Sequence, residues 1–315
     1  MLNNGICHNQ FICGLGSQGK IDPRSTLKLR SMVRLGVHVS VAGGVDRAVS
    51  RAREKGCDAF QIFSSNPRKW ISIPIPSESA ERFLALQRQF CLFPVVDHMP
   101  YLPNLASAND VVYARSLQAL AKELERCRVL GIPYLVTHLG SHLGGGRESG
   151  LARIVAALQT VFSDCDGDTV LLLENSAGTK NSMGSTFSDI AAVLQSLPDE
   201  RRRLGVCLDT CHLHAAGYDL CTSFALQATL DQFQDCIGLE RLMLIHLNDC
   251  KGAIGSHLDR HEHIGLGQIG EEGFRAILCH PALADRAMIL ETPVDARRDD
   301  RGNLEVARRL ASGIK

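Results

Sequence analysis

Six side chains that can bind a metal ion stand at the ends of six short apolar runs of the sequence. They are His98, His138, Glu174, Asp209, His246 and Glu291, separated by 40, 36, 35, 37 and 45 residues. A buried carboxylate is strongly unfavourable unless a cation compensates its charge, and no Lys or Arg stands beside these carboxylates. The pattern therefore predicts that metal ions, rather than basic side chains, neutralise them.

Three further candidate ligands stand in segments that we expect to be loops: His212, three residues after Asp209, and the pair Asp259 and His261. In an extended Asp-x-His segment both side chains lie on one side and can reach one ion. Five imidazoles and four carboxylates are too many for one tetrahedral ion, and they indicate two or three ions. Five nitrogen donors favour zinc, with manganese or iron as alternatives.

The charge balance of the chain indicates what such a site would attract. The formal net charge is zero, so no diffuse basic surface draws in nucleic acid, and a polyanion has to be attracted by a local field. Three divalent ions would carry more charge than the four carboxylates around them. The site would therefore attract and polarise phosphate.

These side chains need a scaffold that brings distant stretches together, and the sequence shows one. Eight apolar, β-rich runs are predicted as strands: 35–39, 59–63, 94–97, 134–137, 169–173, 204–208, 241–245 and 286–290. Amphipathic helical stretches follow them at 45–55, 78–90, 110–130, 148–162, 187–195, 223–234, 271–279 and 304–311. Eight βα repeats predict an α/β fold with a single-domain (β/α)8 TIM barrel, whose strand ends converge on the face that carries active sites.

Three glycines, Gly56, Gly131 and Gly205, lie between a predicted helix and the next strand. Glycine is the residue that most often follows a helix C-terminus, because it adopts a left-handed backbone conformation without strain. We therefore expect all three to end helices.

Gly, Ser, Asn and basic residues dominate residues 1–31, and the first strand-like run begins at Leu35. We expect 1–31 to be an N-terminal extension, disordered or due to a mis-called start, and 32–315 to form the barrel domain. The 12 cysteines include no C-x-x-C pair, which fits a reducing compartment. No run reaches the about 18 apolar residues of a membrane span. We expect a cytoplasmic monomer without membrane contact.

Several longer motifs lie between Leu35 and the C-terminus. They are Gly36-Val37-His38-Val39-Ser40, Asn66-Pro67-Arg68-Lys69-Trp70, His98-Met99-Pro100-Tyr101-Leu102, Glu174-Asn175-Ser176-Ala177-Gly178, Leu208-Asp209-Thr210-Cys211-His212, His246-Leu247-Asn248-Asp249 and Asp259-Arg260-His261-Glu262. Together they resemble the endonuclease IV family, the zinc-dependent apurinic/apyrimidinic endonucleases. The likeness covers nearly the whole chain, and the long C-terminal block is its most specific part.

The resemblance implies a ligand set and a reaction. It assigns His98, His138 and Glu174 to a first zinc ion, Glu174 as a bridge with Asp209, His246 and Glu291 to a second, and His212, Asp259 and His261 to a third. The implied reaction is hydrolysis of the DNA phosphodiester 5′ to an abasic site by a metal-bridging hydroxide, leaving a 3′-hydroxyl. Glu174 and Glu291 would be the catalytic carboxylates, with Glu291 orienting or deprotonating the water.

The resemblance also implies recognition of double-stranded DNA by extrusion of the abasic nucleotide. Arg68, Tyr101 and Leu102 would then insert into the duplex, although a loop Tyr or Leu taken alone more often packs against the protein. Lys69 departs from the family pattern, in which many relatives have a glutamine. His38, which closes the first strand, is expected either to support a metal ligand or phosphate, or to be a structural residue of the rim.

Two other functions stay open on the sequence. A metal-dependent sugar isomerase or epimerase of similar barrel fold would need only one or two ions, so the additional His212, Asp259 and His261 favour phosphodiester chemistry. A non-catalytic barrel that only binds damaged DNA would have no need for both Glu174 and Glu291.

Overall fold

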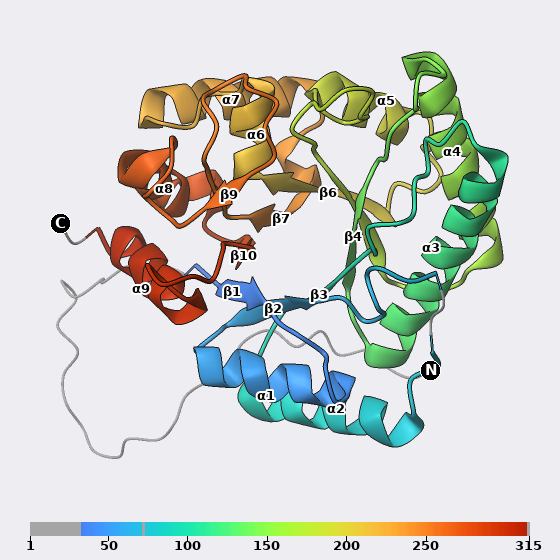
Figure 1. The fold of residues 1–315 in the computed structure, drawn as a ribbon, viewed down its shortest axis with the longest axis horizontal. Coiled ribbons are helices and arrows are strands. Elements are labelled where there is room, and N and C mark those ends of the chain that lie inside the picture. The colour runs from blue at the N-terminus through green and yellow to red at the C-terminus, as the bar shows by residue number, and fades with distance from the viewer. Residues whose placement is uncertain (1–32, 71–72, 314–315) are drawn as a thin grey trace, which may run out of the picture. The chain divides into compact units, whose positions relative to one another are not determined.

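The computed structural model describes residues 33–70 and 73–313, and the expectation for 1–31 lies outside these residues. Within the described part, eight parallel strands close a barrel in the order β1-β10-β7-β6-β5-β4-β3-β2 (Figure 1). They are β1 (Leu35–His38), β2 (Ala59–Ile62), β3 (Val95–His98), β4 (Tyr134–His138), β5 (Val170–Glu174), β6 (Leu204–Asp209), β7 (Leu242–His246) and β10 (Ala287–Leu290). The predicted TIM barrel is confirmed, and each predicted strand end lies within one residue of the observed one.

Helices surround the strands as the outer layer of the barrel (Figure 1). The predicted ones are α1 (Val45–Lys55), α2 (Ser77–Phe90), α3 (Asp110–Leu130), α4 (Arg147–Asp164), α5 (Phe187–Gln195), α7 (Ser223–Cys236), α8 (Gly270–Cys279) and α9 (Asp300–Ala311). Each turns an apolar stripe toward the sheet, as α1 does with Val45, Ala48, Val49 and Ala52. Short 3₁₀ turns, η1 (Leu239–Arg241) and η2 (Pro281–Leu283), precede β7 and β10.

Besides the two 3₁₀ turns, three short elements were not predicted: helix α6 (Thr210–Ala216) and the antiparallel pair β8 (Asp249–Cys250) and β9 (His261–Glu262). His212, expected in a loop, therefore lies on a helix. The side chain of Asp209 caps α6 by accepting a 2.8 Å hydrogen bond from the backbone N–H of His212. A helix this short shows no helical period in the sequence, which explains the miss.

Two of the three glycine predictions are confirmed. Gly56 and Gly131 end α1 and α3 with φ of 80° and 61°. The prediction for Gly205 is wrong, because this residue lies inside β6. A Cβ there would stand 2.8 Å from Leu172 Cδ2 and 2.9 Å from Met243 Cγ, so close packing between neighbouring strands accounts for this glycine.

The inside of the barrel is filled by an apolar layer below the mouth. It consists of Ala59, Val96, Val136, Leu172, Cys207, Leu244, Ala287 and Ile289, all buried. A second, larger core lies between the strands and the helices. This packing makes the strands a rigid base for whatever follows them at the carboxyl end. No helix in the described part of the chain is long and apolar enough to cross a membrane.

Candidate metal centre

A layer of polar side chains lies directly above the apolar layer inside the barrel. Strand side chains alternate between two faces, so the residue two positions after an inward residue also points inward. Counting two positions on from Ala59, Val96, Val136, Leu172, Cys207, Leu244 and Ile289 gives Gln61, His98, His138, Glu174, Asp209, His246 and Glu291. His38 follows Gly36 on β1 in the same way. Seven strands thus contribute one polar side chain each to the mouth, and Glu291 follows directly after the eighth strand, β10.

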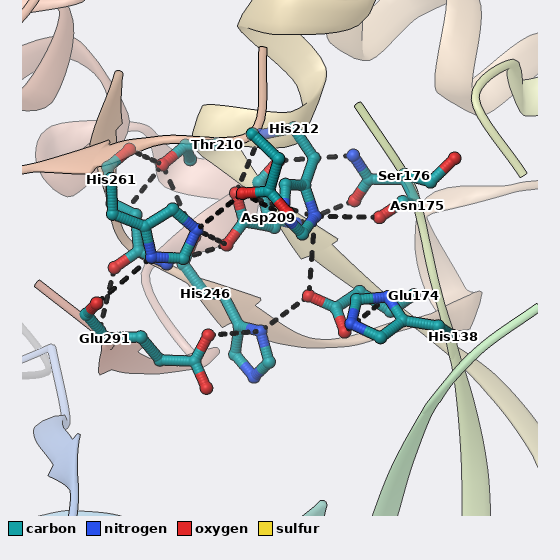
Figure 2. Close-up of polar contacts among 12 residues, drawn as sticks. His138, Glu174, Asn175, Ser176, Asp209, Thr210, His212, His246, His261 and Glu291 are labelled. Carbon is teal, nitrogen blue, oxygen red and sulfur yellow. Dashed lines mark hydrogen bonds and ion pairs between the residues drawn. The ribbon is translucent and has the colours of Figure 1, made fainter. Parts of the chain in front are cut away.

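Glu174 lies among four imidazoles, and Figure 2 labels three of them, those of His138, His212 and His246. Its Oε1 is 2.8 Å from His246 Nδ1 and 3.6 Å from His212 Nδ1. Its Oε2 is 3.1 Å from His98 Nε2 and 3.4 Å from His138 Nδ1. Because its two oxygens face different histidines, this carboxylate is placed to bridge two cations.

Four of the five histidines are held from behind through one ring nitrogen. The pairs are His98 Nδ1 with Met99 O (2.7 Å), His212 Nδ1 with Asn175 O (3.0 Å), His261 Nδ1 with Glu291 O (3.0 Å) and His246 Nε2 with Gln61 Oε1 (2.8 Å). These oxygens only accept, so the ring N–H is located there and the other nitrogen carries a lone pair. That lone pair faces carboxylates, an arrangement that requires a proton or a metal ion in between. Metal-binding histidines typically show this orientation.

The remaining ligands gather beside Asp209. His212 Nε2 is 3.3 Å and His261 Nε2 is 3.6 Å from Asp259 Oδ1, and His261 Nε2 is 3.7 Å from Asp209 Oδ2. β9 carries His261 back over the mouth toward α6, which presents His212 (Figure 2). A helix and a hairpin that the sequence pattern did not reveal therefore complete this part of the site.

Ligand atoms within 4.8 Å of one another form three groups that together contain all nine predicted ligands. The groups are His98, His138 and Glu174; Glu174, Asp209, His246 and Glu291; and His212, Asp259 and His261. A fourth group, Asp209, Cys211 and His261, adds a buried thiol that was not predicted as a ligand. The described residues thus offer donor sets suited to several ions, and the nitrogen-rich composition fits zinc.

The site is closed at its floor and open at its mouth. Asp209 and His246 are fully buried, whereas the side chains of His138 and Asp259 are 43% and 52% exposed. A cavity of about 270 Å³ lies at the mouth and is lined by His138 and Asp259 among the ligands, together with Tyr101 and Phe63. A substrate can therefore enter from the mouth and reach the ligand groups.

Charge interactions shift the pKa values of the central groups. Burial opposes ionisation of Glu174, but the surrounding imidazoles outweigh it and hold the pKa of this carboxyl well below its ordinary value. Burial likewise opposes protonation of His212, yet Asp209 and Asp259 raise its pKa to about 10. In metal-free protein His212 thus holds a proton, which metal ions have to displace.

The three predicted DNA-inserting residues lie on loops beside the mouth. Arg68 is exposed, and the exposed fractions of Tyr101 and Leu102 are 63% and 37%. The backbone N–H of Tyr101 donates to Pro67 O at 3.1 Å, which links the two loops. Tyr101 lines the metal cavity.

A buried ion pair anchors the first of these loops from below. Glu123 on α3 accepts hydrogen bonds from the hydroxyls of Ser64 and Ser65, and Arg126 donates to Ser64 Oγ and to the backbone oxygen of Ile73. The segment between these anchors contains Arg68. The base of the loop is therefore fixed by hydrogen bonds, whereas its tip is exposed.

Sequence reasoning missed two supporting residues, Gln61 and Asn248. Asn248 donates from Nδ2 to Asp209 Oδ2 at 2.6 Å and accepts the backbone N–H of Glu291 at 2.7 Å. Gln61 contacts Glu291 and His246. For Gln61 a signal was present, because it stands at the inward position of a strand, two residues after Ala59.

Comparison with known proteins places this geometry in a family. Residues 49–312 match the family model described as xylose isomerase-like TIM barrel. A protein of Methanoculleus marisnigri named probable endonuclease 4 is 54% identical over 281 residues, which cover 89% of this chain and 99% of that protein.

Solved structures give the same relationship. Endonuclease IV from Thermus thermophilus is 38% identical, with a TM-score of 0.79 over 89% of this chain and 99% of that one. A D-tagatose 3-epimerase-like protein, at 17% identity and a TM-score of 0.67, shares the fold alone. The chain belongs to the endonuclease IV family.

Proposed function

We propose that this protein is a metal-dependent DNA-repair endonuclease that hydrolyses the phosphodiester bond 5′ to an abasic site and leaves a 3′-hydroxyl. The observation that carries this proposal is the convergence of three ligand groups on one cavity whose rim bears Tyr101. The relatives named endonuclease 4 and endonuclease IV support the same activity.

The family is metal-dependent, and we propose zinc, three ions per chain, with manganese as an alternative. The ligand groups would be those described above, with Glu174 shared between two of them. Bound divalent ions would supply Lewis-acid polarisation of the phosphate and would acidify a water molecule. The four histidines held through their outer nitrogen support this proposal, because their inner lone pairs already point to the ion positions.

We assign the catalytic roles to Glu174 and Glu291. Glu174 concentrates negative charge at the centre of the cluster and can hold two ions a fixed distance apart. Glu291 is 21% exposed, so it reaches the cavity, and its carboxylate is oriented by a 2.6 Å hydrogen bond from Gln61. It is therefore placed to orient a water molecule and accept its proton.

We propose that Arg68, Tyr101 and Leu102 contact the duplex and fill the space that an extruded abasic nucleotide leaves. Their exposure and their position on two linked loops beside the cavity support this role. Extrusion requires least energy where no base has to be unstacked, and this difference would give selectivity for damaged DNA.

We further propose that residues 32–315 work as one domain, in a monomer, in a reducing cytosol. The described cysteines form no disulfide, which is compatible with that compartment. Size-exclusion chromatography coupled to light scattering would test the monomer.

The test of the function uses zinc-loaded protein and a duplex with one abasic site at a defined position. We expect a nick 5′ to the site, and a DNA polymerase should extend the resulting 3′-end. The same duplex without the abasic site is the control and should stay intact. Absence of nicking, together with epimerisation of free ketoses, would contradict the proposal and favour the sugar epimerase alternative.

A further inference from the structure

Two of the eight inward polar residues, His38 and Gln61, are outside the proposed ligand set. Gln61 is fully buried, and its amide touches three side chains of the mouth. Its Nε2 is 2.6 Å from Glu291 Oε1 and 3.1 Å from His38 Nδ1, and its Oε1 is 2.8 Å from His246 Nε2. Two of these partners, Glu291 and His246, belong to the proposed ligand set.

These contacts allow one orientation of the amide. The carboxylate of Glu291 only accepts, so the amide atom facing it has to be the NH₂ group. A reversed amide would place two oxygens 2.6 Å apart, which is repulsive. With this orientation, Gln61 Oε1 accepts the Nε2–H of His246, and the Nδ1 lone pair of His246 is directed to the ligand cluster.

The same orientation determines the tautomer of His38. One N–H of the Gln61 amide donates to Glu291, and the other donates to His38 Nδ1. Nδ1 of His38 is therefore an acceptor, and in the neutral ring the proton is on Nε2. No acceptor for this Nε2–H is found among the described residues.

His38 lies where two cavities meet. It lines the metal cavity and also a neighbouring cavity of about 720 Å³, which Ser40 and Asn66 line as well. Its side chain is 21% exposed, and its ring packs against Phe63 with centroids 4.3 Å apart. The ring is thus held in place while its free N–H can reach a ligand that extends from one cavity into the other.

We propose that His38 is a substrate-binding residue that donates its Nε2–H to a non-bridging phosphate oxygen of the DNA, and that Gln61 is the positioning residue that presets this donor. The inference rests on the proposed phosphodiesterase function for the identity of the natural ligand. A neutral donor beside a cation cluster stabilises the phosphate without repelling the metal ions. Gln61 thereby couples the phosphate contact to Glu291 and to the metal ligand His246.

The first test is binding of inorganic phosphate to the zinc-loaded protein, measured by isothermal titration calorimetry. His38→Phe keeps the ring volume and removes the donor, and we expect phosphate binding to weaken about 10-fold. His38→Gln places an amide N–H near the position of Nε2, and we expect it to restore most of the affinity. Unchanged binding by His38→Phe, with zinc content equal to wild type, would overturn the proposal.

The second test separates the inference from the proposed function. On abasic duplex, His38→Phe should lower kcat/KM by about 10- to 100-fold, and His38→Gln should recover most of it. Equal losses in both variants would indicate a purely structural role and overturn the donor assignment. If wild-type protein binds phosphate through His38 but does not nick abasic DNA, the endonuclease proposal fails while the phosphate donor stands.

The positioning role of Gln61 has its own readout. In the ¹⁵N spectrum of zinc-loaded wild-type protein, the His38 ring should show an unprotonated Nδ1 and a protonated Nε2. Gln61→Met removes the hydrogen bonds of the amide to His38, Glu291 and His246, and the two tautomers of His38 should then become mixed. In a double-mutant cycle, His38→Phe should cost much less activity in the Gln61→Met background. Additive effects and an unchanged tautomer would contradict this role.

Discussion

The metal centre and the two loops that carry Arg68, Tyr101 and Leu102 lie side by side but are built differently. The centre consists of strand-end side chains that are mostly buried and held from behind by hydrogen bonds. The loops are held at their base, by Glu123 and Arg126, and their tips are exposed. With the roles proposed above, chemistry would depend on rigid placement, whereas DNA recognition would depend on side chains that are free to enter the duplex.

Glu174→Gln is the strongest way to break the centre without touching the loops. The variant loses the charge that faces four imidazoles, so we expect nicking to fall by about 1,000-fold or more, with a lower zinc content. Circular dichroism should show an intact fold. Glu148→Gln, an exposed position on α4, is the matched control and should leave activity unchanged. Retained activity in Glu174→Gln would refute the assigned role.

Removal of the metal ions should have the next largest effect, and it acts directly on the metal centre. Prolonged treatment with a strong chelator should abolish nicking and lower the Tm, because bound ions stabilise the folded state. A brief treatment with a mild chelator should have little effect, since ions beside fully buried Asp209 and His246 exchange slowly. Added zinc should restore activity. Full activity after metal analysis shows no bound ion would exclude a metal centre.

Tyr101→Ala should impair DNA binding by the loops and leave the metal centre unchanged. Loss of an aromatic insertion should weaken binding of abasic duplex by about 10-fold, with unchanged zinc content. Val129→Ala, at a partly exposed apolar residue near the end of α3, is the control and should bind as wild type does. Equal affinity of Tyr101→Ala and wild type, measured by fluorescence anisotropy, would count against insertion.

The smallest effect should be on stability as a function of pH. In metal-free protein the pKa of His212 is about 10 against an ordinary 6.5, so its stabilising contribution is complete below 6.5 and is lost as the pH rises through 10. In zinc-loaded protein the imidazoles must be neutral, so metal affinity and stability rise over the same range. The Tm of the two forms should therefore change in opposite directions between pH 7 and 10. Parallel changes would show that these groups do not exchange protons for metal.

The lowered pKa of Glu174 makes the metal-free protein less stable at acid pH, the opposite pH dependence to that of His212. Its contribution is present above the ordinary value of 4.5 and is lost as the pH falls below it. The metal-free cluster should thus be most favourable between about pH 4.5 and 6.5, the range in which Glu174 is ionised and His212 is protonated. His212→Gln should lessen the alkaline loss of stability in metal-free protein, because the raised pKa values of His98 and His246 still contribute to it, and should leave the acid loss.

The sequence alone determined the barrel and the set of candidate ligands. Each strand is an apolar run of limited length between turn residues, and alternation with period two places the strand-end side chains on the inside. His98, His138, Glu174, Asp209 and His246 each end a strand for this reason. Local pattern therefore contained the information for these positions.

Only the tertiary structure decided how these side chains are paired. His212 lies on a helix too short for a visible period, and Gln61 meets Glu291 and His246 across 230 and 185 residues of chain. Which nitrogen of each histidine faces the cluster depends on the oxygen behind it, such as Asn175 O for His212. These contacts follow from closure of the barrel, which joins strands distant in sequence, and no local spacing encodes them.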